Sequence, residues 1–175
     1  MGLTTDEQTE EAYTTEDVPD AVRAALYTAT GSRRELLLSV ATDIQADGSY
    51  GATWILATDE HLVAVTTDEG EVAGEPACIR LADIKEVEVR GLFGSGVIKV
   101  RTDSAGTTLA HFSLSLIPKF AELPAQIERL VRNSREVGEE EKIAKRNLDG
   151  GHAQPKRCDR CGRAIPHWMG VCPVC

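Results

Sequence analysis

The sequence predicts a mainly β domain, capped by one C-terminal helix and followed by a small cysteine-containing module. Three observations carry this prediction. Short apolar runs separated by turn residues fill the middle of the chain, an amphipathic pattern follows them, and four of the five cysteines lie in the last eighteen residues. Composition divides the chain into an acidic tail, a β domain, a linker and a cysteine module, over residues 1–17, 18–137, 138–157 and 158–175.

Composition excludes several protein classes. The first twenty residues hold seven acids, no base and no apolar core, so they do not form a signal peptide, and residues 1–17 are expected to be a disordered tail. The longest apolar runs are about half of the roughly 20 residues that a membrane-spanning helix needs, so no transmembrane segment is expected in this chain. A net charge of −9 argues against coating nucleic acid or an anionic membrane by charge alone.

The middle of the chain is expected to form seven strands. A short helix over 18–29 comes first, because its apolar residues recur every four positions. Asp47-Gly48 supplies the first hairpin turn. Apolar runs and period-two alternation place strands at 35–44, 50–57, 62–67, 77–81, 86–92, 97–101 and 107–113.

One amphipathic helix closes the domain. Its apolar residues fall at steps of three and four, and they are Phe120, Leu123, Ile127, Leu130 and Val131. Pro118 suits a first turn, and Pro124 marks a second start or a kink. Seven antiparallel strands and this helix predict a small, partly open barrel with the helix at one end. Residues 138–157, charged and then broken by glycine and proline, are expected to be a linker.

The last eighteen residues predict a zinc site. Cys158 and Cys161 form one C-x-x-C pair, Cys172 and Cys175 form another, and ten residues separate the pairs. Four thiolates suit tetrahedral Zn²⁺, with Zn–S distances near ~2.3 Å, and leave no open coordination position, so the zinc would be structural. A terminal cluster without a leader also favours metal over disulfides, although reduced or oxidised cysteines without metal remain the alternative.

The segment CGRAIP followed by a second C-x-x-C resembles compact zinc ribbons, with Ile165 and Pro166 at the matching positions and Pro173 inside the second knuckle. Between the knuckles lie His167 and Trp168. The favoured interpretation is that Trp168 covers the zinc site and His167 is solvated. The alternatives are that Trp168 anchors a partner, or that His167 replaces one thiolate.

The β domain resembles the bacterial branch of the pleckstrin-homology (PH)/GRAM-like superfold. The Thr58-Asp59 turn, the strand that resumes at Leu62, and the step Asp83-Ile84-x-x-Val87 carry the resemblance over about 100 to 120 residues. It implies a PH-like binding scaffold. Phosphoinositide-binding members usually carry Lys and Arg in the first hairpin, whereas this one reads IQADGSY, which argues against phosphoinositide binding.

No motif in the β domain predicts catalysis, so the chain as given is not expected to be an enzyme. The glycine-rich GLFGSG leads into another strand and is expected to be a hairpin turn, not a phosphate loop. Asp43, Asp59 and Asp83 lie at strand ends, where caps and turns explain them. The lone Cys78 is expected in the core.

A PH-like domain followed by a zinc ribbon resembles the cytoplasmic region before the transmembrane helices of some exporter-type ABC transporters. That resemblance implies a regulatory or docking region at the inner face of the plasma membrane, with membrane and ATPase domains downstream. The position of Cys175 at the end of the sequence leads us to expect that the natural chain continues. The alternatives are a free-standing adaptor for a protein partner or, less favoured, a nucleic-acid factor that uses the four basic residues of 156–163.

Overall fold

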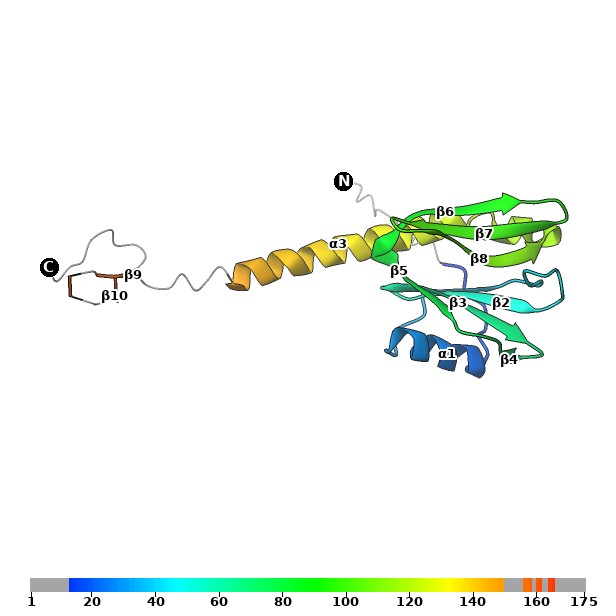
Figure 1. Ribbon diagram of the computed structural model, residues 1–175, viewed down its shortest axis with the longest axis horizontal. Helices are drawn as coiled ribbons and strands as arrows, with labels where there is room; N and C mark the ends of the chain where they lie inside the picture. The colour runs from blue at the N-terminus through cyan, green and yellow to red at the C-terminus, as the bar shows by residue number, and fades with distance from the viewer. Residues whose placement is uncertain (1–12, 150–155, 159, 162–163, 166–175) are drawn as a thin grey trace, which may run out of the picture. The chain divides into compact units, whose positions relative to one another are not determined.

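A computed structural model of the 175-residue chain describes residues 13–149, 156–158, 160–161 and 164–165. The fold is mainly β, with a long C-terminal helix (Figure 1). The chain divides into two compact units, residues 1–135 and 136–175. We call the first unit the body.

Two open antiparallel sheets form the body. The first contains β1 (Leu38–Ala41), β2 (Ala52–Ala57), β3 (His61–Asp68), β4 (Glu71–Val72) and β5 (Ala77–Arg80), with β4 and β5 both paired to β3. The second contains β6 (Ile84–Gly91), β7 (Ser95–Thr102) and β8 (Gly106–Ser113). Isolated bridges from Ile44 to Tyr50 and to His111 link the first hairpin to β8.

Every expected strand segment contains a strand, but the count of seven is one short for the body. The additional strand, β4, is two residues long and pairs with β3 through a two-residue turn. Glu69 and Gly70 in that turn both have positive φ, of 49° and 87°, as a type I′ hairpin requires. No strand was expected between residues 67 and 77, because β4 has too few residues to show a period.

The body has three layers, and the first sheet lies in the middle (Figure 1). One of its faces packs against α1 (Asp20–Thr30), where Val22 and Leu26 meet Leu56, Val63 and Val65. Its other face contributes Leu38, Ile55 and Leu62 to the main core. Burial on both faces explains why β2 and β3 read as continuous apolar runs instead of alternating ones.

The C-terminal helices complete the main core. A 3-10 turn (Leu114–Leu116) leads into α2 (Ile117–Phe120), and α3 runs from Leu123 to Asp149. Pro118 and Pro124 each occupy a first helical turn, as expected. All five apolar positions predicted for the helix are buried, together with side chains of both sheets. Phe120 packs on Phe112 of β8, with ring centroids 4.6 Å apart.

Two expected boundaries differ from the structure. Within the expected tail, Thr14 and Glu16 hydrogen-bond to Ser39 of β1, and Thr15 forms a parallel bridge to it, so the body begins by residue 13. Residues 1–12 lie outside the described residues. Within the expected linker, α3 continues to Asp149, because Glu and Lys favour helix strongly even without an apolar face.

The N-terminal segment, residues 13–17, covers the outer edge of β1. Glu16 accepts a hydrogen bond from the Ala41 amide at 3.0 Å and pairs with Lys119 at 2.7 Å. Thr14 exchanges two hydrogen bonds of 2.9 Å with the side chain of Gln126 on α3. This edge of the sheet is therefore paired and tied to the helix, which removes it as a template for another chain.

Candidate functional site

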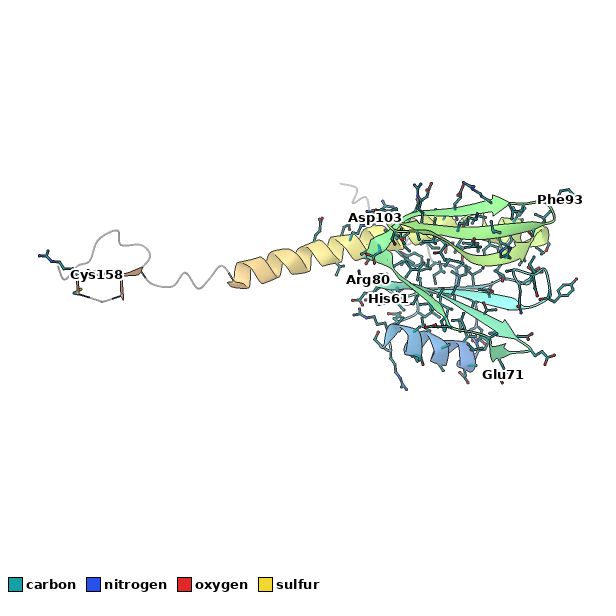
Figure 2. The ribbon with its side chains drawn as sticks, viewed as in Figure 1. His61, Glu71, Arg80, Phe93, Asp103 and Cys158 are labelled. Atoms are coloured by element: carbon teal, nitrogen blue, oxygen red, sulfur yellow. The ribbon has the colours of Figure 1, made fainter. Side chains whose placement is uncertain are left out.

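The second unit places the first cysteine pair in a hairpin. β9 (Lys156–Arg157) and β10 (Ala164–Ile165) pair antiparallel, with Arg157 opposite Ala164 and Lys156 opposite Ile165. Cys158 directly follows β9 and is half-buried (Figure 2), while Cys161 is exposed in the connection between the strands. The chain thus reverses direction around the C-x-x-C segment.

This hairpin suits metal binding by thiolates. Two cysteines three positions apart in a tight reversal can direct both sulfurs toward one ion, which is the arrangement of a zinc knuckle. Cys172 and Cys175, which complete the predicted set, lie outside the described residues, as do His167 and Trp168. Within the described part of the chain, no three His, Cys, Asp or Glu side chains gather around one point.

The aspartates at strand ends of the body are structural. Asp43 accepts hydrogen bonds from the Ser113 amide, at 2.8 Å, and from the Ser113 hydroxyl. Partial burial raises the pKa of Asp43, but the hydrogen bonds from Ser113 and the charge of Lys119 outweigh it and leave the pKa below its ordinary value. This carboxylate clamps the end of β8 to the chain that follows β1.

Asp59 and Asp83 take part in exposed ion pairs. Asp59 pairs with Arg34 at 2.5 Å, and Asp83 pairs with Arg80 at 3.0 Å. Such exposed pairs contribute only about 0–1 kcal/mol each, so they fix turn geometry more than stability. The interpretation of these aspartates as turn and cap residues agrees with their contacts.

The body histidines lie apart. His61 is half-buried on β3, and its Nδ1 has no hydrogen-bond partner among the described residues. His111 lines a cavity of about 230 Å³ between the sheets, together with Gln45, Thr53, Thr66 and Thr108. Neither ring hydrogen-bonds to a hydroxyl, thiol or carboxylate within residues 13–135. The hydroxyl groups of Thr53 and Thr66 hydrogen-bond to each other at 3.3 Å.

The expectation for Cys78 was wrong. Cys78 is exposed on β5, which pairs with β3 on one side and lies at the edge of the sheet. Its neighbour Ile79 packs against the main core, so Cys78 lies on the opposite face of the strand. Desolvation raises the pKa of its thiol, so the neutral form is favoured. A cavity of about 350 Å³ lies beside it, lined by Arg80, Asp83 and Asp103 among others.

Sequence reasoning missed a group of exposed apolar side chains at hairpin ends. Tyr50 and Phe93 are 91% and 109% exposed, and Leu92, Leu114 and Ile117 are also exposed. The signal for Phe93 is an aromatic residue inside a glycine-rich hairpin turn, where no core can reach it. The spacing rules that identify helices and strands do not extend to turns.

No described helix is both long enough and apolar enough to cross a membrane. Comparison with protein-family models and with curated proteins finds no match to this chain.

Proposed function

We propose that the chain is a non-catalytic docking region, in which a PH-like β scaffold binds a protein and a structural zinc ribbon follows it. The observation that carries the zinc part is the β9–β10 hairpin, which brackets Cys158 and Cys161. A hairpin around a C-x-x-C pair is what a zinc knuckle requires, and the sequence supplies a second pair ten residues later.

The energetics of the second unit support metal binding. Its described strands are two residues each, too short to bury an apolar core of their own. Zinc coordination supplies on the order of 10–16 kcal/mol in comparable zinc peptides, which is enough to order such a hairpin. The proposed ligands are the thiolates of Cys158, Cys161, Cys172 and Cys175.

Support for the scaffold role comes from the architecture of the body. Two open sheets and a C-terminal helix share one apolar core, an arrangement compatible with the proposed PH-like scaffold. Polar side chains at strand ends of the body take part in turns and clamps, as Asp43 and Asp83 do. This arrangement suits a scaffold that binds a partner through its surface better than an enzyme with an active site.

Metal analysis tests the zinc ribbon. Protein purified under reducing conditions is expected to hold one zinc per chain, and Cys158→Ser combined with Cys172→Ser should lose it. Cys78→Ser is the matched control, because this exposed cysteine belongs to the other unit and should leave the zinc content unchanged. Zinc-free wild-type protein would contradict the proposal, and so would full zinc retention by the double variant.

The position of this region in a larger protein is a separate part of the proposal. We place it before the membrane and ATPase domains of an exporter-type ABC transporter, on the cytoplasmic side. Reading the gene past codon 175 tests this: about six apolar segments of roughly 20 residues and a Walker motif are expected downstream. A stop codon at that point would instead favour the free-standing adaptor.

A further inference from the structure

The large apolar side chains exposed on the described residues are concentrated in a few places. Six are exposed, and five of these belong to three short segments: the β1–β2 loop, the β6–β7 turn, and the 3-10 turn together with the first residue of α2. We call these five side chains the tip surface: Tyr50, Leu92, Phe93, Leu114 and Ile117. Scattered exposed apolar residues are ordinary, but a group at one end of a domain marks an interaction surface.

Strand pairing brings the three segments to the same end of the body. Ser95 pairs with Ser113, so the β6–β7 turn lies beside the residues that follow β8. Ile44 bridges both Tyr50 and His111, which places the β1–β2 loop next to β8 as well. Figure 2 shows Phe93 at this end, with His61, Arg80 and Asp103 at the opposite end.

Closed turns hold these side chains in solvent. Leu92 donates its amide proton to the Ser95 carbonyl at 2.6 Å, and Gly94 adopts a φ of 84° that few other residues accept. The β1–β2 loop is closed by the Gly48 amide on the Gln45 carbonyl at 3.0 Å. Because the backbone fixes the turns, Phe93 and Tyr50 have no apolar surface to fold back on.

An acidic turn lies next to the tip surface. Ala52 pairs with Thr67, so the β3–β4 turn is adjacent to the β1–β2 loop, and Figure 2 places Glu71 at the same end as Phe93. Four exposed carboxylates of this end form no ion pair within residues 13–135, and they are Asp47, Asp68, Glu69 and Glu71.

The cations that flank the tip surface in the chain do not neutralise these acids. Arg90 pairs with Glu88, and Lys119 pairs with Glu16. This end therefore presents apolar side chains together with uncompensated negative charge.

We propose that the tip surface docks a protein segment that carries apolar anchors together with Lys or Arg. Apolar anchors would cover Phe93 and its neighbours, while the basic side chains would face the β3–β4 turn, which gives charge complementarity. An anionic membrane would be repelled by the same carboxylates, and a second copy of the chain would bring two acidic turns together. The proposal rests on the scaffold role of the body and not on the zinc ribbon.

The test uses the full, zinc-loaded chain and a fluorescein-labelled helical peptide of about 18 residues built from Leu and Lys at three- and four-residue spacing. Two control peptides replace Lys by Glu or Leu by Ser. Fluorescence anisotropy should show binding of the Leu/Lys peptide and affinities at least about tenfold weaker for both controls. Amide chemical-shift changes should map to the segments around Tyr50, Phe93 and Leu114.

Variants localise the interaction. Leu92→Ser combined with Phe93→Ser should weaken Leu/Lys peptide binding by at least about tenfold, since anchors dominate interface energies. Asp68→Asn combined with Glu71→Gln should weaken it several-fold and flatten its salt dependence. Val137→Ser is the matched control, because Val137 is an exposed apolar residue that lies outside the tip surface. An unchanged amide spectrum away from the mutated turn verifies folding of each variant.

Several outcomes would overturn the proposal. The first two are that the Leu/Lys peptide does not bind, or that it binds the folded Leu92→Ser, Phe93→Ser variant as tightly as the wild type. The third is that phosphatidylcholine vesicles capture the wild type but not this variant. The fourth is that the wild type is a dimer and this variant is a monomer. Zinc content is measured on the same samples. Peptide binding that persists in the Cys158→Ser, Cys172→Ser variant would show that this surface acts independently of the ribbon. Amide chemical-shift changes elsewhere on the body would retain the scaffold role but exclude this surface as the binding site.

Discussion

The body and the β9–β10 hairpin obtain their order by different means. In the body, both sheets and α3 share one buried apolar core, and α1 adds a second cluster on the far face of the first sheet. The hairpin has two strands of two residues around a cysteine pair. Order in the first comes from burial that the hydrophobic pattern encodes, whereas order in the second, on the proposal made above, comes from zinc, which no hydrophobic pattern encodes.

The largest expected effect is that of zinc removal, which should unfold the hairpin and leave the body folded. Excess chelator at neutral pH should shift the amide signals of Lys156 and Ile165 to random-coil positions, because the hairpin would lose the roughly 10–16 kcal/mol of coordination that orders it. The melting temperature of the body should stay the same within error. Persistence of the hairpin signals after metal loss would show that it folds without a ligand.

Two phenylalanines probe the role of burial within the body. Phe112 is fully buried, so Phe112→Ala should lower the free energy of unfolding by about 3–5 kcal/mol through lost burial and a cavity. Phe93→Ala, at a fully exposed position, should change it by no more than about 0.5 kcal/mol. Urea denaturation followed by circular dichroism measures both changes, and equal losses would contradict the assignment of the core.

Close packing predicts a smaller effect at Gly96. Gly96 lies opposite Phe112 on the neighbouring strand, and a Cβ there would come within 2.2 Å of the Phe112 ring. Gly96→Ala should therefore destabilise the body by about 1–3 kcal/mol, as overpacked cores do. Gly106→Ala provides the control, since nothing lies within 4 Å of its added Cβ. Similar stability of the two variants would mean that Phe112 relaxes without cost.

The smallest effect is expected at Asp43, and it depends on pH. Hydrogen bonds to an ionised acceptor contribute about 1–2 kcal/mol, so Asp43→Asn should lose roughly that much at pH 7. Since the folded-state pKa of Asp43 is lowered, its contribution is present above the unfolded value of about 3.9 and is lost as pH falls through the folded-state value. Wild-type and variant stabilities should converge at low pH, and Asp68→Asn should show no such loss.

The strands and α1 were predictable because their signals are local. Apolar runs such as that of β3 and turn pairs such as Asp47-Gly48 identify elements without knowledge of the tertiary fold. The length of α3 was not predicted, because residues 138–149 show no apolar face and resemble a linker by composition. Residues 13–17 were assigned to the tail for the related reason that their partners, Ser39 and Gln126, are distant in sequence.

The candidate sites likewise divide into residues that local sequence singles out and residues whose exposure only the tertiary structure shows. Spacing alone singles out Cys158 and Cys161, since the number of residues between ligands fixes whether both can reach one ion. Exposure depends on which strand lies at an edge and which turn lies beyond the core, so the positions of Cys78 and Phe93 required the tertiary structure. Residue type suggested a core place for Cys78, and the topology places it on an edge strand instead.

The N-terminal segment has a consequence for synthesis of the chain. Thr14 leaves the ribosome before any strand, yet its side-chain partner Gln126 follows it by 112 residues. Until α2 and α3 have emerged, residues 13–17 are held by β1 alone, and if they detach, the outer edge of β1 is open to pairing with other nascent chains. The cover over this edge is therefore complete only once residues 13–17 contact α3, and a truncation before Gln126 would hold it less firmly.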